Sequence, residues 1–377
     1  MVEKTCDLVE RAKTIPDPRR QCRNLKHRLE DILVLGFCGV LAGCDDFVEI
    51  AEWAQHNETF FRTFLELPHG IPSHDTFNRV FALVKPTTLQ DVLLPWLLQR
   101  RGRPGDWIHL DGKAMRRTRQ TSKGRDALHV VSAWAGQAGL TLGQVAVEAK
   151  SNEIAALPQL IQLLDVRKKT VTIDAVGCQK DIAETVAEQG GDYVLSVKEN
   201  QPTLHAEVQA AFAMATTPFS PAREVSTSDD DHGRQEERTV RVLPASRYLS
   251  ESTMAAWVGL VSLAMVLRRV TCQATGAVST EVSYYISSLH PQARRIGEAI
   301  RGHWGIENGL HWVLDVVFRE DARRLYDRRA AENVAFLNRL ALSVLRGDPS
   351  NGSLKVKRKR AGWNLQYLAQ LLGLPSV

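Results

Sequence analysis

The pattern of apolar residues changes near residue 106, and this change limits the folds that the chain can adopt. Before it, apolar residues recur every three or four positions, as on one face of a helix. After it, short runs rich in valine, isoleucine and aromatic residues alternate with helical segments, in the order strand, strand, strand, helix, strand, helix, strand. The sequence therefore predicts a helical domain over residues 1–105, followed by a mixed sheet flanked by helices, of α+β or α/β class.

An insertion is expected to divide the sheet-forming region. The predicted core strands are 107–110, 128–134, 140–148, 170–173 and 193–197, and the predicted core helices are about 151–164 and 181–188. A helix at 203–214 and a polar loop at 226–238 precede strand-like runs at 239–242, 257–267 and 278–286. We expect residues 203–290 to form an inserted β-rich subdomain, and residues 106–202 and 291–345 to form the core. The basic residues 346–377 are expected to be a loosely ordered tail.

Composition excludes several classes of protein. Hydrophobic residues make up 44% of the 377 residues and charged residues 24%, as in ordinary globular chains rather than disordered or fibrous ones. The longest strongly apolar stretch, residues 32–43, is far shorter than the roughly 20 residues that span a bilayer. The N-terminal region lacks the apolar core of a signal peptide, so we expect a cytoplasmic protein without a membrane partner. The 6 cysteines form no CxxC pair, which argues against a disulfide scaffold or a structural zinc site.

Basic residues are clustered along the chain, although the formal net charge is only +5. Between Arg11 and Arg28 there are seven lysines and arginines against one acid, between Arg100 and Arg125 nine against two, and residues 355–360 read KVKRKR. Such clusters can neutralise phosphate groups. Each of them is equally compatible with an ordinary solvated surface.

Two short apolar strands each end in an aspartate. The run IHL at 108–110 is followed by Asp111, and the run VTI at 171–173 by Asp174. If the two strands are neighbours in one sheet, the carboxylates stand side by side, and their oxygens can hold a hard divalent cation. The alternative is that each aspartate only caps the turn after its strand.

A further acidic group lies in the last helical region of the predicted core. A spacing of four residues places His303, Glu307, His311 and Asp315 on one helical face among apolar neighbours. Zinc binding by His303, Glu307 and His311 is a rival interpretation, but the ligand order lacks the HExxH pattern. If the helix is rotated, the rival third carboxylates are Asp315, Glu320 and Asp321.

Three glycines weaken the same helical segment. Gly302, Gly305 and Gly309 each cost about 1 kcal/mol of helix stability relative to alanine. A helix that keeps them is expected to bring its backbone close to another element.

The N-terminal region is compatible with two helical arrangements. A short amphipathic segment, predicted as a helix from His74 onward, follows a turn at Gly70 and Pro72. A helix-turn-helix reader of DNA can be built in this way. A plain helical bundle explains the same periodicity.

Seven segments of the chain carry a resemblance to a known family. They are HLDGKAMRR (109–117), KSNEIAALPQLIQLLD (150–165), TIDAVGCQ (172–179), GGDYVLSVKENQ (190–201), HGRQEER (232–238), YYISSL (284–289) and IRGHWGIENGLHWVLDVVFRED (300–321). In this order, over residues 20–345, they closely resemble the bacterial insertion-sequence transposases of the H-repeat-associated group. The order of the strands and the placement of the acids likewise resemble the RNase H-like catalytic core of DDE transposases and integrases.

The resemblance implies a catalytic triad and an activity. Asp111, Asp174 and Glu307 would hold two Mg²⁺ or Mn²⁺ ions, and water would attack a phosphodiester at each element end. The freed 3′-hydroxyl would then attack target DNA. The helical N-terminal domain would bind the DNA ends, and a homodimer on double-stranded DNA is expected because two ends must be joined. Such an enzyme would act in the cytoplasm, at the bacterial nucleoid. The residues that could contact DNA, in or beside the resembling segments, are Lys113, Arg116, Arg117, Lys198, Asn200, Gln201, Arg234 and Arg301.

The chain departs from the family pattern at two places. Glu199 stands where the family more often has a glycine. Related transposases place a tyrosine and an arginine before the glutamate and a lysine after it. Here His303 stands four residues before Glu307 and Leu314 seven after it, so Arg301 is the candidate replacement.

Three other functions stay open at this point. A catalytically inactive or domesticated transposase would bind DNA without cutting it, although the three acids argue against this. An RNase H-like nuclease would hydrolyse DNA without joining it, and strand transfer would separate the two. An unrelated enzyme with a basic surface would leave the ordered segments unexplained.

Overall fold

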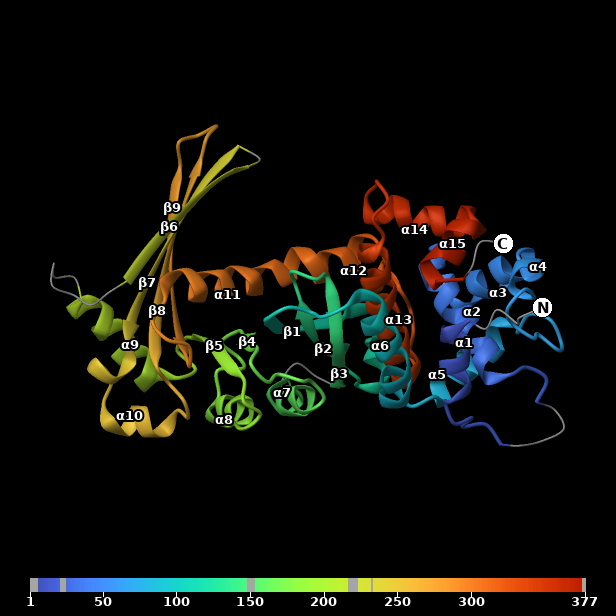
Figure 1. Cartoon of the computed structure of the whole chain (residues 1–377), viewed down its shortest axis with the longest axis horizontal. Coiled ribbons are helices and arrows are strands. Elements are labelled where there is room, and N and C mark those ends of the chain that lie inside the picture. The colour runs from blue at the N-terminus through green and yellow to red at the C-terminus, as the bar shows by residue number, and fades with distance from the viewer. Residues whose placement is uncertain (1–5, 21–24, 148–152, 216–222, 232, 375–377) are drawn as a thin grey trace.

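The molecule is organised around one mixed sheet. The computed structural model describes residues 6–20, 25–147, 153–215, 223–231 and 233–374. Within them the sheet has nine strands in the order β3-β2-β1-β4-β5-β9-β8-β7-β6 (Figure 1). The strands of its core half are β1 (Trp107–Met115), β2 (Leu128–Ala135), β3 (Leu140–Val147), β4 (Thr170–Ile173) and β5 (Asp192–Val197).

Strand directions in this half match the expected class. β1, β4 and β5 are parallel, whereas β2 pairs antiparallel with β1, and β3 antiparallel with β2. Parallel pairing needs crossovers, and α7 (Glu153–Gln162) and α8 (Lys180–Glu188) supply them on one face of the sheet. α11 (Ala293–Ile306) crosses the other face (Figure 1). The predicted mixed sheet flanked by helices is confirmed, in an RNase H-like arrangement; the predicted start of α7 at Ser151 and Asn152 lies outside the described residues.

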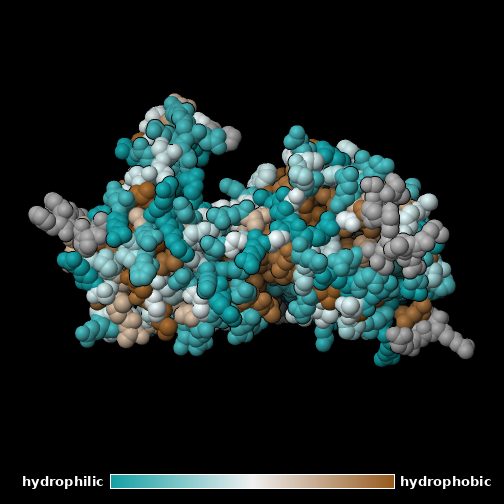
Figure 2. Space-filling model, in the orientation of Figure 1, coloured by the Kyte–Doolittle hydropathy of each residue, from teal (hydrophilic) through white to brown (hydrophobic). Residues whose placement is uncertain are grey.

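The insertion extends the same sheet. Its elements are α9 (Pro202–Met214), β6 (Arg223–Asp231), β7 (Arg234–Pro244), α10 (Glu251–Ala256), β8 (Ser262–Cys272) and β9 (Val278–Ser287). β9 pairs antiparallel with β5, so the inserted strands continue the core sheet. They project beyond the core as a ribbon with a mostly hydrophilic surface (Figures 1 and 2).

Two predictions for the insertion are wrong. Almost all of the predicted polar loop at 226–238 belongs to β6 and β7. Because the projecting ribbon is open to solvent, cross-strand ion pairs such as Arg268–Glu236 (2.7 Å between Nε and Oε1) replace the apolar alternation of a half-buried strand. The strand predicted at 257–267 begins only at Ser262, after α10 and a turn.

The N-terminal helices pack against the far end of the core. They are α1 (Asp7–Lys13), α2 (Leu29–Ala42), α3 (Phe47–His56), α4 (Glu58–Phe61), α5 (His74–Leu83) and α6 (Pro86–Arg101). The 20-residue α13 (Arg328–Gly347) contacts α2, α5 and α6 and also β2 and β3, so it connects these helices to the sheet. Nearly all of α2 is buried, which explains why it is apolar on every side. The domain boundaries at residues 105, 202, 290 and 345 stay predictions.

Residues 354–372 form two packed helices, so the prediction of a loosely ordered tail is wrong for them. α14 (Leu354–Trp363) packs against α2 and α13, and α15 (Leu365–Leu372) against α14 and α2. The guanidinium of Arg358 is buried and donates to the carbonyl groups of Val40, Cys44 and Val317. The basic run at 355–360 therefore supplies a structural cation as well as surface charge.

The helical region predicted at 291–345 is interrupted. α11 continues through a π-helical turn (Glu307–His311) into α12 (Trp312–Val316). The chain then reverses at Arg319, where φ is 52°, before α13 begins. Among the residues that the structure describes, no helix has both the length and the apolar character that crossing a membrane requires.

Candidate active site

Asp111 lies in the middle of β1 rather than at its end. β1 continues to Met115 because β2 pairs with it as far as Leu128, although β4 leaves β1 after Ile173. The prediction of a strand end is therefore wrong for Asp111. Its side chain points to the face of the sheet that α11 covers, since it approaches His311.

Asp174 directly follows β4, as predicted. The parallel register pairs Leu110 with Ile173, so the next residues, Asp111 and Asp174, stand side by side. Asp174 Oδ1 also accepts a hydrogen bond from the Val176 amide at 3.1 Å. Asp174 thus caps the following turn while its charge faces that of Asp111.

Glu307, in the π-helical turn, brings its carboxylate near Asp111. Its side chain is 70% exposed, and Oε2 lies 3.6 Å from His311 Nδ1. Asp111 Oδ2 lies 3.5 Å from the same nitrogen. One ligand atom each from Asp111, Glu307 and His311 lies within 4.8 Å of the others. The predicted Glu307 therefore joins Asp111, with His311 between them.

The carboxylates in this cluster disfavour one another's charge. Burial, and then the charge of Asp174, raises the pKa of Asp111 to about 8. Glu307 and Glu153 add to this effect, whereas the Gly112 amide opposes it by donating a hydrogen bond. Carboxylates gathered in this way keep their charge only beside a compensating cation. The donor set of oxygens with one imidazole nitrogen suits a divalent metal ion.

His303 does not join the cluster. Thr172 Oγ1 lies 2.9 Å from His303 Nδ1 and 2.7 Å from His109 Nδ1, so one hydroxyl connects both rings. Burial lowers the pKa of His303 to about 4, and the ring is therefore neutral. The structure does not bring His303, Glu307 and His311 together as a zinc site. The group whose ligand atoms lie close together contains Asp111, Glu307 and His311.

The glycines of the helix have different roles. A Cβ atom at Gly302 would lie 2.7 Å from the His109 ring, so this glycine lets α11 approach β1 closely. At Gly305 a Cβ atom would meet nothing within 4 Å. At Gly309, inside the π-helical turn, the carbonyl accepts a 2.6 Å hydrogen bond from Arg346. The predicted close approach is thus confirmed at Gly302 and absent at Gly305.

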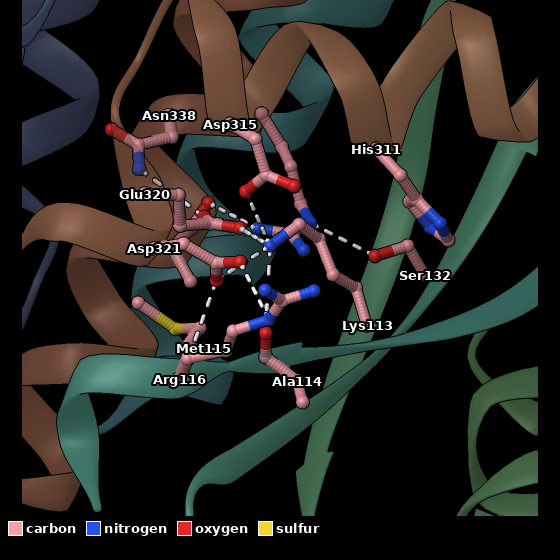
Figure 3. Close-up of polar contacts among 12 residues, drawn as sticks. Lys113, Ala114, Met115, Arg116, Ser132, His311, Asp315, Glu320, Asp321 and Asn338 are labelled. Carbon is pink, nitrogen blue, oxygen red and sulfur yellow. Dashed lines mark hydrogen bonds and ion pairs between the residues drawn. The ribbon is translucent and has the colours of Figure 1, made fainter.

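Lys113, predicted to contact DNA, is buried in a carboxylate network (Figure 3). Its Nζ lies 2.7 Å from Asp315 Oδ1, 3.0 Å from Asp321 Oδ1 and 3.7 Å from Glu320 Oε2. Figure 3 shows these three carboxylates converging on Lys113, with His311 to one side. The structure gives Lys113 an internal role, which does not favour a phosphate contact.

The three rival carboxylates, Asp315, Glu320 and Asp321, all belong to the network around Lys113. Glu320 and Arg339 are both fully buried, with 2.9 Å between Oε1 and Nη1. Burial alone would raise the pKa of Glu320, but the charges of Arg339 and Lys113 bring it below its usual value. Asp315 and Asp321 pair with Lys113, so none of the three acids stands with Asp111 in the candidate metal cluster.

The other predicted DNA contacts fall into two groups. Arg116, Arg117, Lys198, Arg234 and Arg301 are exposed, although Arg116 also pairs with Asp321 and Arg301 with Asp229. Asn200 and Gln201 instead hold the loop after Asp174. The Asn200 amide donates to the Ala175 carbonyl at 2.7 Å, and the Gln201 amide to the Cys178 carbonyl at 2.9 Å.

One buried pair beside the site was missed from the sequence. His129 Nε2 and Glu153 Oε2 lie 3.1 Å apart, both almost completely buried. A Cβ atom at Gly112 would lie 2.2 Å from that nitrogen and 2.4 Å from Glu153 Oε1. The only sequence signal was the glycine that follows Asp111, since nothing in the chain order links residues 129 and 153.

Comparison with known proteins gives consistent matches over the chain. A family described as "Transposase DDE domain" matches residues 99–344, and one described as "DDE_Tnp_1-associated" matches residues 9–97. The chain is 36% identical over 368 residues to "Putative transposase YncI" of Escherichia coli O157:H7, covering 97% of this chain and 94% of that protein. It is 34% identical over 369 residues to "H repeat-associated putative transposase YhhI" of Escherichia coli (strain K12), covering 97% of each.

A solved structure was matched more weakly. The piggyBac transposase synaptic complex with hairpin DNA gives a TM-score of 0.40 at 11% identity, covering 99% of this chain and 78% of that one. This likeness is too weak to carry an argument about either fold or function.

Proposed function

The chain belongs to the transposase DDE domain family, and from that premise we propose that it cuts phosphodiester bonds at insertion-sequence ends and joins the freed 3′-hydroxyls to target DNA. The observation that carries the proposal is that Asp111 has Asp174 beside it in the sheet and Glu307 near it from the helix. These acids come from β1, the turn after β4 and the π-helical turn. Nothing in their separate positions along the chain requires them to meet, so a shared chemical role explains the arrangement.

We propose that this site holds two divalent cations, Mg²⁺ or Mn²⁺. Asp111 and Glu307 each offer a carboxylate oxygen to the same small region, and Asp174 lies beside Asp111. The raised pKa of Asp111 supports a cation as the natural neighbour of this cluster. When bound, such ions would help to deprotonate the attacking hydroxyl or water and would stabilise charge on the leaving oxygen.

The chain's own residues would hold and orient the DNA. Arg116, Arg117, Lys198, Arg234 and Arg301 are exposed, so their positive charges can meet phosphates. Lys113, Asn200 and Gln201 would act on the protein itself, because they position the strand and loop that carry the two aspartates. Residues 1–105 would bind the element ends, and a homodimer would bring two ends together.

No side-chain nucleophile is required for this chemistry. The thiol nearest to Asp174 along the chain, that of Cys178, is completely buried. Burial, followed by the charge of Asp174, raises its pKa to about 12. A thiol in that state is a poor nucleophile. Direct attack by water and then by the DNA 3′-hydroxyl agrees better with the site.

The test is a cleavage and strand-transfer assay on DNA that carries the flanking element ends, with Mg²⁺ and with EDTA. Asp111→Asn and Glu307→Gln should lose cleavage while they retain DNA binding. Glu184→Gln, which removes one exposed charge from α8 on the opposite face of the sheet, is the matched control and should cut normally. Cleavage that persists in Asp111→Asn would contradict the proposed triad.

Two other outcomes would identify the alternatives. Binding of the ends without cutting under any condition would indicate a DNA-binding protein that has lost catalysis. Cutting without joining would indicate a nuclease that only hydrolyses.

A further inference from the structure

His311 is a buried side chain whose polar atoms are not satisfied by the protein. It is 6% exposed, and its Nε2 atom has no hydrogen-bond partner among the described residues. Its Nδ1 atom lies 3.5 Å from Asp111 Oδ2 and 3.6 Å from Glu307 Oε2. Both distances exceed those of an ordinary N–H···O hydrogen bond. A cation bound at Nδ1 would satisfy that atom, whereas the Nε2 proton would stay buried without a partner among the described residues.

The spacing of the three atoms suits a shared cation. Ligands that each bind one metal ion at about 2.1 Å lie about 3.0–3.5 Å from one another in octahedral or tetrahedral geometry. The two distances from His311 Nδ1 are slightly longer than this, and all three ligand atoms lie within 4.8 Å of one another. A small rotation of the exposed Glu307 side chain would bring its Oε2 atom to the distance from Nδ1 that two ligands of one cation have.

The backbone presents His311 and Glu307 together. Both belong to the π-helical turn, a local widening of the helix that is frequent at functional sites. Arg346 braces this turn, because it donates to the Gly309 carbonyl and its guanidinium lies 5.3 Å from the centre of the Trp134 ring. The turn is thus held in place independently of any ligand.

Binding at Nδ1 would require one particular tautomer of the ring. A neutral imidazole carries its proton on one nitrogen and a lone pair on the other. With the proton on Nε2, the Nδ1 lone pair would point toward a cation held by Asp111 and Glu307.

We infer that His311 binds one of the two proposed divalent cations through Nδ1, alongside Asp111 and Glu307. This inference rests on the proposed function, because it concerns the cation that these acids would hold. Imidazole suits transition-metal ions better than Mg²⁺, which prefers oxygen ligands. The site should therefore prefer Mn²⁺ to Mg²⁺ by a larger factor than an all-carboxylate site would.

His303 provides a matched control on the same helix. It is also a neutral histidine, but its Nδ1 atom lies 2.9 Å from Thr172 Oγ1 and so already has a partner. His303→Gln and His311→Gln make the same chemical change two turns apart. Only the second should affect the cation.

The experiment is pulsed electron paramagnetic resonance of Mn²⁺ bound to the full-length chain without DNA, together with Mn²⁺ titration. We expect a ¹⁴N coupling in the wild type and in His303→Gln, and none in His311→Gln. Mn²⁺ affinity should fall at least about tenfold in His311→Gln. His311→Asp, which offers oxygen instead, should bind Mn²⁺ but lower the Mn²⁺ over Mg²⁺ preference.

Histidine labelling removes dependence on the stability of the variants. In wild-type protein made with ¹⁵N-histidine, the ¹⁴N coupling should be replaced by a ¹⁵N coupling. Mn²⁺ bound in an Asp111-dependent way without any histidine coupling would overturn the inference, and so would the absence of an Asp111-dependent Mn²⁺ site.

The DNA assay separates this inference from the proposed function. DNA joining by a wild-type protein that shows no histidine coupling would refute the His311 ligand and leave the transposase activity standing. Histidine coupling in a protein that never cuts DNA would support the His311 ligand and refute the transposase activity.

Discussion

The ammonium of Lys113 lies 2.7 Å from Asp315 Oδ1, and this contact ties β1 to the helix that follows Glu307. Lys113 stands two residues after Asp111, and Asp315 eight residues after Glu307. The ion pair therefore connects the two segments that carry opposite sides of the candidate site. Around it, Asp321 and the buried Glu320 complete a charge network that lies next to the site without belonging to it (Figure 3).

Lys113→Met should destabilise the fold. Removing the ammonium leaves Asp315, Asp321 and the buried Glu320 with less compensating charge, at a cost of about 3 kcal/mol. Urea unfolding measures the effect. Lys123→Met, at an exposed position, should stay within about 0.5 kcal/mol of the wild type. Equal stabilities for the two variants would show that the network contributes nothing.

Two glycines on α11 should respond oppositely to alanine. Gly302→Ala places a Cβ atom 2.7 Å from the His109 ring, so it should displace the helix and lower both stability and DNA cleavage. Gly305→Ala meets nothing within 4 Å and should stabilise the chain by about 0.5–1 kcal/mol through helix propensity. Thermal unfolding of the two variants compares them directly. A stabilised Gly302→Ala would mean that α11 does not approach β1 as closely as described.

Glu332 on α13 should make stability depend on pH. Burial raises its pKa from 4.5 to about 7. The folded state therefore holds the proton more tightly, so the stabilising contribution is complete below pH 4.5 and is lost as the pH rises through 7. Over that window the free energy of unfolding should fall by up to about 1.4 kcal/mol per pH unit from this group. Urea unfolding across the window should show a flatter profile for Glu332→Gln, and an unchanged profile would exclude Glu332 as the cause.

Arg358→Met should separate the C-terminal helices from the core. The buried guanidinium donates to three carbonyl groups, from Val40, Cys44 and Val317, and losing it should cost at least about 3 kcal/mol. The neighbouring Lys359→Met, at an exposed position, is the control and should be nearly neutral. Limited proteolysis after residue 348 would check the location of the effect. Cleavage there should be faster in Arg358→Met than in Lys359→Met.

Local sequence patterns predicted most of the core elements. The strand at 170–173 is β4 as predicted, and the strand predicted at 193–197 differs from β5 by one residue, because buried parallel strands are short apolar runs between turn residues. The ribbon of β6 and β7 was missed for the opposite reason. Its strands are exposed, polar and paired through ions, so they lack the alternation that marks a half-buried strand.

The candidate site was predictable in part. Asp111, Asp174 and Glu307 stood out because their segments resemble those of a family and because acids follow apolar strands. The role of Lys113 could not be read in the same way, since its partners Asp315 and Asp321 lie about 200 residues away. Long-range pairing of this kind depends on how α12 and the following turn pack onto β1.

The sequence by itself determined the helical and mixed-sheet regions, the acids available for chemistry and the family resemblance, because these depend on local spacing and residue type. Only the tertiary structure decided which polar groups meet. In the folded chain Lys113 is buried among carboxylates, and His303 is hydrogen-bonded to Thr172. His311 lies between Asp111 and Glu307. The physical reason is that burial removes water, so each polar side chain must take the partner that the packed elements bring to it.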